Sequence, residues 1–347
     1  MLNTYSAENV TYYTYRGTRS TEGCKIQRDT NRIQKDVLME TTANTDALFQ
    51  ALTKTFSNHA ILCDEPMARH TTFQVGGPAD YLVRPTSAEE IHGAITAAKK
   101  CNMPWWVIGC GSDLLVSDEG LRGVVIEIGN SMASITIDGT TVHAQAGATN
   151  EEVAKAACTA GLAGYEFASG IPGSIGGAAI MNAGAYEGEF KDVARKVTCL
   201  YPNGEIQSIP AEKAEWSYRH SMMGDEGLIV LEVELELHPD TPDAIQERMN
   251  DLAARRSAKQ PLEMASAGST FKRPTGYFAG KLIQDSGMQG HTVGGAQVST
   301  KHAGFVVNTG DAKAADILQV IRDVQAAVKE QFDVNLETEV KMWGFDS

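Results

Sequence analysis

The sequence predicts an α+β protein with mixed sheets. Short apolar runs of strand length alternate with stretches in which apolar residues recur at helical spacing. Of the 347 residues, 42% are hydrophobic and 21% are charged, a composition that can bury a full core. A chain of this length accommodates two or three domains. We expect an N-terminal extension over residues 1–44 and two domains, 45–239 and 240–347.

Residues 1–44 differ in composition from the rest of the chain. They are polar and rich in Thr, Tyr, Arg and Asn, with little periodic pattern. We therefore predict an extension of low structural content, disordered in one interpretation and a targeting or regulatory arm in another. Organised patterning begins near Thr45. Within the first domain we expect two subdomains, of about residues 45–118 and 119–239.

Strands are predicted where a short apolar or alternating run ends at residues that favour turns. Asp138-Gly139 and Asn203-Gly204 each mark a hairpin turn between two such runs. At the end of the chain, Val334, Leu336, Val340 and Met342 alternate with polar residues, which predicts one long final strand. The strands expected in chain order are residues 79–84, 105–108, 124–128, the two arms of the hairpin 134–148, 197–201, 205–209, 228–237 and 334–342.

Helices are predicted where capping residues precede apolar residues at helical spacing. Ser87 and Glu90 match a capping box, and Ile91 and Ile95 continue the pattern. Further helices are expected over residues 150–159, 244–257 and 312–332.

Two glycine-rich segments stand out among these elements. Residues 170–186 (GIPGSIGGAAIMNAGAY) carry no charge and are rich in Gly and Ala. Because these side chains are small or absent, the backbone amides can come close to a ligand or to another backbone. The turn from Gly109 to Asp113 lies between two predicted strands, whereas a Rossmann turn opens a helix. Successive amides in such a turn can still form an anion-binding nest. For residues 170–186 the alternative interpretation is a small-residue loop packed between sheets.

Composition excludes several classes of function. The formal net charge of −14 argues against nucleic acid as a partner, because phosphate backbones require an excess of Lys and Arg. No long apolar run and no basic-then-apolar leader is present, so we expect neither membrane insertion nor secretion. The six cysteines form no CxxC pair and no metal-ligand spacing with His, which favours reduced thiols in the cytoplasm and no metal site.

Five side chains are candidates for chemistry or ligand binding. Ser269 can deliver a proton to an enolate, or it is an ordinary turn serine. Arg219 can clamp a carboxylate, or it forms a surface ion pair. Glu339 lies on the polar face of the predicted final strand, where plain solvent exposure is the alternative. Lys272 and Arg273 suit a phosphate or carboxylate, or they are a solvated charge pair.

Taken in order, six motifs resemble one family. The segments that carry the resemblance are HTTFQVGGPAD (70–80), GCGSDLLV (109–116), GIPGSIGG with NAGAY (170–186), YRHS (218–221), GSTFKRP (268–274) and LETEV (336–340). Together they are similar to the UDP-N-acetylenolpyruvoylglucosamine reductases, the FAD-dependent UDP-N-acetylmuramate dehydrogenases of bacterial peptidoglycan synthesis. Residues 277–303 further resemble the second type of this family, which lacks an extra substrate-covering loop.

The resemblance implies a fold and a cofactor. We expect an FAD-binding domain of the vanillyl-alcohol-oxidase-like type, built of two α+β subdomains, and a C-terminal α+β substrate-binding domain. Non-covalent FAD is expected, with NADPH as co-substrate, a UDP-sugar as substrate and an open oligomeric state. The residues implied in cofactor binding are Gly109, Cys110, Gly111, Ser112, Asp113, Ile171, Pro172, Gly173, Ser174, Gly176 and Gly177. Asp113 departs from the family, which usually has Asn there; a carboxylate beside a diphosphate is unfavourable unless it turns away or bonds to amides.

The resemblance also implies a catalytic trio, Arg219, Ser269 and Glu339. NADPH first reduces the flavin and leaves; hydride then passes to the β-carbon of the enolpyruvyl group. Arg219 stabilises the carboxylate side of the resulting enolate, Glu339 orients or polarises the same region, and Ser269 protonates the α-carbon. Tyr218, Lys272 and Arg273 are expected to bind the UDP-sugar.

Two alternatives remain open from the sequence. An FAD-dependent oxidase or dehydrogenase of the same fold, acting on another sugar or acid, would turn over with oxygen. A non-catalytic flavin- or nucleotide-binding protein would show no kinetic effect of Ser269→Ala.

Overall fold

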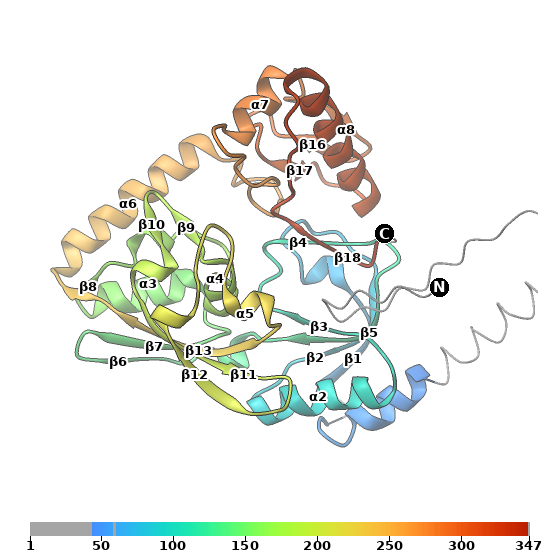
Figure 1. Cartoon of the computed structure of the whole chain (residues 1–347), viewed down its shortest axis with the longest axis vertical. Helices are drawn as coiled ribbons and strands as arrows, with labels where there is room; N and C mark the ends of the chain where they lie inside the picture. Colours follow the sequence, from blue (N-terminus) through green and yellow to red (C-terminus); the bar gives the residue numbers. More distant parts are fainter. Residues whose placement is uncertain (1–43, 58–59, 346–347) are drawn as a thin grey trace, which may run out of the picture. The chain divides into compact units, whose positions relative to one another are not determined.

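The computed structural model describes residues 44–57 and 60–345. The predicted N-terminal extension therefore lies outside the described residues, except for residue 44, which opens a helix over residues 44–52. The described chain is α+β, as the sequence predicts, with a four-stranded sheet, a five-stranded sheet and a smaller C-terminal sheet (Figure 1). Short 3₁₀ helices connect these elements at Met67–Arg69 (η2), Asn130–Met132 (η3), Glu166–Ala168 (η4), Phe190–Asp192 (η5) and Ala211–Lys213 (η6).

The first sheet is mixed and has the order β1-β2-β5-β3. Its strands are β1 (Ile61–Pro66), β2 (Pro78–Val83), β5 (Leu121–Glu127) and β3 (Trp105–Ile108), with β1 antiparallel to β2 and the other pairs parallel. Helix α2 (Ala88–Lys100) buries Ile91, Ala94, Ile95 and Ala98 in a hydrophobic core to which both large sheets contribute. Its Ser87 cap is confirmed, because the Ser87 hydroxyl accepts from the Glu90 amide at 3.3 Å. The expected domain limits stay predictions, although β5 extends this sheet beyond residue 118.

The second sheet is antiparallel throughout and has the order β12-β11-β13-β7-β6. Its strands are β12 (Ile206–Pro210), β11 (Ala194–Leu200), β13 (Ile229–Glu236), β7 (Thr141–Gln145) and β6 (Ile135–Asp138). Both predicted hairpins are confirmed here. The remaining elements of this region are α3 (Asn150–Thr159), α4 (Ile175–Met181), α5 (Met222–Asp225) and the short strand pairs β8 (Leu162–Ala163) with β14 (His238–Pro239) and β9 (Gly184–Ala185) with β10 (Gly188–Glu189).

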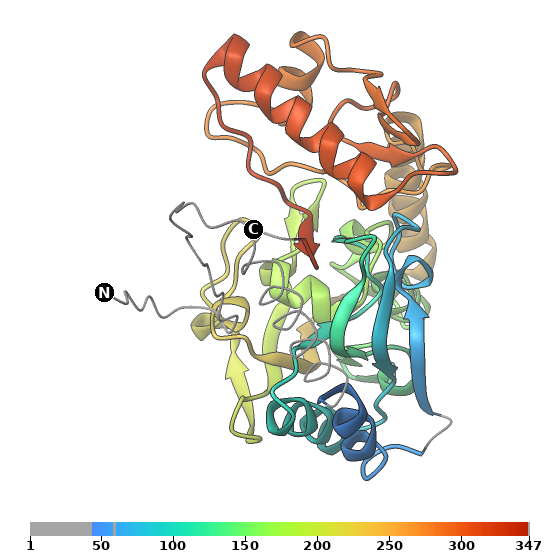
Figure 2. The same ribbon diagram turned by 90° about the vertical axis from the view of Figure 1, so that its right-hand side faces the viewer.

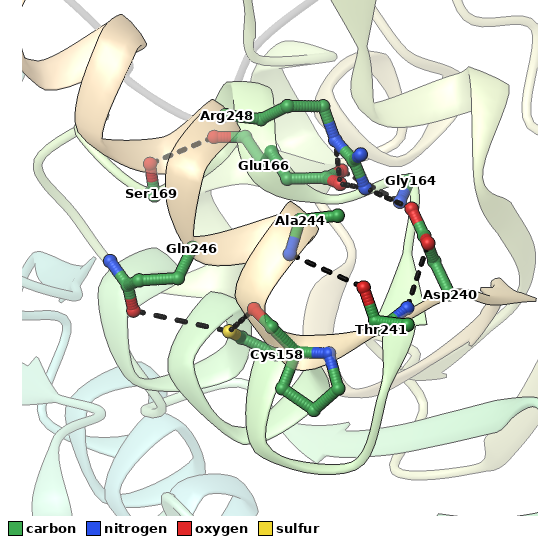
Figure 3. A network of polar contacts seen from close by, with 10 residues as sticks. Cys158, Gly164, Glu166, Ser169, Asp240, Thr241, Ala244, Gln246 and Arg248 are labelled. Carbon is green, nitrogen blue, oxygen red and sulfur yellow. Dashed lines mark hydrogen bonds and ion pairs between the residues drawn. The ribbon is translucent and has the colours of Figure 1, made fainter.

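Helix α6 (Pro242–Lys259) leads from this region toward the C-terminal part, and polar contacts fix its first turns (Figure 3). Arg248 binds the Glu166 carboxylate at 2.8 Å and the Asp240 carboxylate at 2.7 Å. The Cys158 thiol donates to the Pro242 carbonyl oxygen at 3.5 Å. These contacts fix the direction of α6 and so the position of its last turn.

The C-terminal part packs one long helix on a small sheet. Helix α8 (Ala314–Phe332) buries Ile317, Val320, Ile321, Val324 and Val328 against the strands β15 (Thr292–Val293), β16 (Ala296–Val298) and β17 (Val306–Asn308). A short helix, α7 (Ala279–Asp285), packs against α8 and was not predicted. Phe73, Val75 and Leu115 of the first region enter the same core, so the two regions share buried apolar surface.

The end of the chain returns to the first region (Figures 1 and 2). Strand β18 (Lys341–Trp343) pairs in parallel with β4 (Leu114–Val116), which follows the first glycine turn. The predicted strand over residues 334–342 is therefore wrong for most of its length. Before β18 only an isolated bridge, Phe271 to Thr338, is formed, because no neighbouring strand runs beside this segment. Leu336 and Val340 are buried as expected, but Met342 is 39% exposed.

Candidate active site

A cavity of about 520 Å³ opens between the two glycine-rich segments and the C-terminal part. Its walls come from the turn after β3, the segment leading into α4, the last turn of α6 and the chain end before β18. The predicted cofactor residues that line it are Gly109, Cys110, Gly111, Ser112, Asp113, Ile171, Pro172, Gly173, Ser174 and Gly177. The catalytic candidates Arg219, Ser269 and Glu339 line it as well.

The first wall is the turn from Gly109 to Asp113, which joins β3 to β4. A side chain is excluded at Gly111, where φ is +59° and a Cβ would lie 1.9 Å from the His70 carbonyl oxygen. A Cβ at Gly109 would meet the Ser174 hydroxyl at 2.2 Å. The glycines therefore let this turn pass close to the backbone before it and to the second wall.

The second wall is the segment from residue 170 to residue 177, and it is held from two sides. The Ser112 hydroxyl donates to the Pro172 carbonyl oxygen at 3.2 Å, which ties the two walls together. Asn150 donates from its side-chain amide to the Gly173 carbonyl oxygen at 3.2 Å, and the Tyr165 hydroxyl in turn donates to Asn150 at 2.8 Å. Because Tyr165 and Asn150 are each 1% exposed, this wall is anchored in the core.

Helix α4 (Ile175–Met181) begins inside this second wall. It forms because the Ser174 hydroxyl accepts from the Gly177 amide and because the alanines that follow favour a helix. Gly176 does not line the cavity: a Cβ there would lie 2.8 Å from the Ala146 Cβ. Its prediction as a cofactor residue is not supported by the geometry, since its missing side chain serves the close packing of α4 on the strand-end residue Ala146.

Three segments far apart in the sequence bring the catalytic candidates together. Arg219 donates from Nε to the Glu339 carboxylate at 2.5 Å, across 120 residues of chain. The Glu339 amide donates to the Thr270 carbonyl oxygen at 2.9 Å, which places Glu339 beside the Ser269 loop. Ser269 itself is exposed toward the cavity. The pairing rules out plain solvent exposure for Glu339, whose side chain is 13% exposed.

The conformation and charge of Arg219 are both unusual. Its φ of +55° lies in the left-handed region that non-glycine residues rarely adopt, and such strain gathers at functional sites. Burial acts to lower the pKa of Arg219, but the Glu339 charge and hydrogen bond outweigh it, so the pKa is raised. The guanidinium stays charged and faces the cavity.

The predicted substrate residues divide into two groups. Tyr218 and Arg273 line a second, more open pocket that shares Arg219, Gly184 and Ala185 with the main cavity. The Arg273 amide donates to the Tyr218 hydroxyl at 3.1 Å, so these two segments are in contact. Lys272 lines neither pocket and lies 3.4 Å from the Glu337 carboxylate.

Among the polar residues of the cavity wall that sequence analysis missed are Arg256, Gln260 and Lys341. Burial lowers the pKa of Arg256, and no acidic partner of its guanidinium is found between residues 60 and 345. The Gln260 Oε1 atom is buried without a hydrogen-bond partner. Nothing in the helical pattern of residues 244–257 distinguished Arg256 from a surface arginine, because its position depends on how α6 is anchored.

Asp113 is the other cavity residue with an unsatisfied buried atom. Its Oδ2 is buried without a hydrogen-bond partner, so no backbone amide donates to this oxygen. Burial, and then the negative charge of Glu339, raise the pKa of Asp113 to about 7 against the opposing charges of Lys341 and Arg219. A carboxyl in this position exchanges its proton near neutral pH.

Comparison with known proteins agrees with this geometry. Residues 79–209 match the model of an FAD-binding domain family, and residues 260–343 match that of the C-terminal domain of UDP-N-acetylenolpyruvoylglucosamine reductase. A UDP-N-acetylenolpyruvoylglucosamine reductase of Agathobacter rectalis is 51% identical over 307 residues, 85% of this chain and 98% of the relative. One of Clostridioides difficile is 48% identical over 303 residues, 87% of this chain and 100% of the relative.

A solved structure is similar over the same region. The UDP-N-acetylenolpyruvylglucosamine reductase of Thermus caldophilus superposes with a TM-score of 0.70 at 34% identity, over 82% of this chain and 98% of that one. The fold and the glycine-walled cavity thus define an FAD-dependent oxidoreductase. The identity of about half of all aligned residues with the two relatives above shows which family of these oxidoreductases the chain belongs to. The chain belongs to the UDP-N-acetylenolpyruvoylglucosamine reductase family.

The cavity fits FAD on two observations of this structure. Gly109, Gly111 and Gly173 line the cavity and have no side chain, so a ligand there meets backbone. The Arg256 guanidinium, which has no acidic partner among the described residues, is a cation in the cavity wall that can pair with a diphosphate. None of the helices between residues 44 and 345 is long and apolar enough to cross a membrane. The described residues also hold no group of three or more His, Cys, Asp or Glu suited to a metal ion.

Proposed function

We propose that this chain reduces UDP-N-acetylenolpyruvoylglucosamine to UDP-N-acetylmuramate through bound FAD, with NADPH as the electron source. The observation that carries the proposal is the convergence of Arg219, Ser269 and Glu339 on one cavity from three distant segments. FAD, when bound, supplies the hydride chemistry that no side chain can perform. The reaction consumes cytoplasmic nucleotide metabolites, so we place the enzyme in the cytoplasm.

Binding of the cofactor is assigned to the two glycine walls. The turn from Gly109 to Asp113 lines one side of the cavity, and Ile171, Pro172 and Gly173 line the opposite side. Arg256 is assigned to the diphosphate, because an unpaired guanidinium in a partly buried site binds anions strongly. Cys110 lines the same cavity, and we expect dissociable FAD rather than a thioether link.

Binding of the substrate is assigned to the region around Arg219. Its guanidinium offers donors to the enolpyruvyl carboxylate, while Glu339 holds it from the other side at 2.5 Å. The nucleotide end is assigned to the neighbouring pocket with Tyr218 and Arg273. Lys272 lines neither pocket, so we do not assign it to binding of the UDP-sugar. The assignment to the second type of the family stays a prediction.

The proton in the reaction comes from Ser269. Addition of a hydride to the β-carbon of the enolpyruvyl group leaves charge on the α-carbon and its carboxylate. Arg219 stabilises this charge because its guanidinium is already fixed by Glu339 and needs no reorganisation. The Ser269 hydroxyl then gives its proton to the α-carbon, which completes addition of one hydride and one proton across the double bond.

Ser269→Ala tests this assignment with Ser266→Ala as a matched control from the same loop. Anaerobic stopped-flow mixing with NADPH follows loss of the yellow flavin absorbance, and subsequent mixing with substrate follows its return. In Ser269→Ala we expect normal reduction by NADPH and reoxidation slowed by at least about a hundredfold, the range of a lost general acid. The control is expected to behave as wild type in both steps.

The outcome separates the alternatives. If both steps survive in Ser269→Ala, the proton-donor assignment is wrong. Rapid reoxidation of the wild-type enzyme by oxygen, with indifference to the enolpyruvyl substrate, would indicate an oxidase instead. A protein that binds FAD but is not reduced by NADPH would indicate a binding protein.

A further inference from the structure

His70 lies between two carboxylates behind the first wall of the cavity. Its Nδ1 atom is 2.8 Å from the Glu127 Oε1 atom, and its Nε2 atom is 3.0 Å from the Glu65 Oε1 atom. The side chain of His70 is 5% exposed, so water reaches it little. A neutral imidazole donates from one nitrogen only, so both hydrogen bonds to carboxylates form only when the ring is an imidazolium.

The charges around His70 favour this imidazolium form. The hydrogen bond to Glu127 raises the pKa of His70, burial opposes the rise, and the bond to Glu65 adds to it. Burial acts to raise the pKa of Glu127 in turn, but its bonds with His70 and Arg84 outweigh burial, so the pKa of Glu127 is lowered. The charged or titratable groups of this cluster are Glu65 of β1, Arg69 of η2, Arg84 after β2, Glu127 of β5 and the Cys110 thiol of the glycine turn.

The backbone of His70 supports the first wall directly. A Cβ at Gly111 would lie 1.9 Å from the His70 carbonyl oxygen, so the glycine turn rests against this residue. The Thr72 amide donates to the Gly111 carbonyl oxygen at 3.1 Å, which holds the same contact. Glu127 is the last residue of β5 and pairs with Ile108, the residue before the turn. The His70 side chain therefore ties the loop that supports the turn to the strand end beside its start.

We propose that His70 is a positioning residue for the cofactor: as an imidazolium it holds the turn from Gly109 to Asp113 in the form that binds FAD, and loss of its proton weakens FAD binding. A neutral ring leaves one carboxylate without the donor from His70 in a partly buried site, which favours movement of the loop or of the strand end. The inference needs only that FAD lies in this cavity, so it does not depend on the substrate or on the electron source.

Release of FAD from the loaded enzyme is the direct test. The dissociation constant is measured on dilution, from the fluorescence of released flavin, at about pH 6 and about pH 9, which bracket the titration of a histidine held by carboxylates. We expect wild-type affinity to fall about tenfold between them, within the range of about 5–150-fold common for coupled sites. His291→Gln is the matched control and should follow wild type, because His291 pairs with one carboxylate, Asp323, and lines neither pocket.

Glu65→Gln separates the two hydrogen bonds from the effect of charge alone. The new side-chain amide can donate to Nε2 of a neutral ring whose Nδ1–H donates to Glu127, so both bonds survive loss of the proton. We therefore expect this variant to bind FAD equally well at both pH values. His70→Gln has no titrating group at this position and should also be independent of pH, with the weaker affinity that wild type shows at about pH 9.

Nuclear magnetic resonance of the His70 ring, assigned by its absence in His70→Gln, measures the same coupling from the other side. Because coupling is reciprocal, the proton affinity of His70 is expected to be about tenfold higher in FAD-loaded than in FAD-free protein. Equal proton affinity in the two forms, or a wild-type FAD affinity that does not change with pH, overturns the proposal. A pH dependence that persists in Glu65→Gln would show that charge alone couples His70 to FAD, and the positioning role falls. Unchanged FAD affinity in His70→Gln, with a lower Tm, would leave His70 a structural residue only.

Discussion

Asp118 caps a helix that lies almost 200 residues further along the chain. Its two carboxylate oxygens accept the amides of Ala314 and Ala315, each at 2.9 Å, at the first turn of α8. The residue in the N-cap position of α8 is Lys313, whose side chain has no acceptor, so Asp118 takes the role that a local Ser, Thr or Asp normally fills. The contact joins the loop after β4 to the main helix of the C-terminal core.

Asp118→Ala removes both hydrogen bonds and the charge at the positive end of the helix dipole. A lost cap costs about 1 kcal/mol, and the charge–dipole interaction adds roughly 0.3–1 kcal/mol. Together they predict a loss of about 1–2 kcal/mol in the free energy of unfolding. For a protein of this size that corresponds to a fall in Tm of about 1.5–3 °C.

Thermal unfolding of the FAD-loaded enzyme, followed by circular dichroism, measures this change. Asp118→Asn keeps an acceptor and loses the charge, so about half the effect is expected. Glu119→Ala changes the exposed neighbour and serves as control. A Tm of Asp118→Ala within about 0.5 °C of wild type would refute the inference that Asp118 stabilises α8.

Two further predictions concern the cofactor site and pH. Gly109→Ala puts a Cβ 2.2 Å from the Ser174 hydroxyl, so purified protein should retain less FAD per chain by absorbance, whereas Gly224→Ala, with its nearest neighbour at 3.6 Å, should retain it; equal FAD content would contradict the close approach of the two walls. The hydrogen bond of His70 to Glu127 at 2.8 Å raises the pKa of His70. Its stabilising contribution is therefore full below the unfolded pKa of about 6.5 and is lost as the pH rises through the folded pKa. Urea midpoints should fall over this window in wild type and not in His70→Gln; parallel pH profiles would show that His70 is not the group responsible.

Local sequence signals predicted most elements of the fold. The hairpin turn at Asp138-Gly139, the cap at Ser87 and the apolar stripe of the helix ending at Phe332 each act within a few residues, and each is confirmed. Helix α4 was not predicted, because the two glycines in its first turn lower helix propensity and its cap at Ser174 was taken for part of a loop. The strand over residues 334–342 was overpredicted, because alternation records which side is buried but not whether a partner strand exists.

The residue types at the site were also available from the sequence, through the ordered motifs that resemble one family. What the sequence alone determined is which backbone segments can approach a ligand and which side chains can carry charge or a proton. The tertiary structure decided how these groups meet: Arg219 with Glu339, Asp113 beside Glu339, and Arg256 unpaired in the cavity wall. The physical reason is distance along the chain. Burial and pairing of a charge depend on elements that only the packed core brings together, and no local pattern encodes that placement.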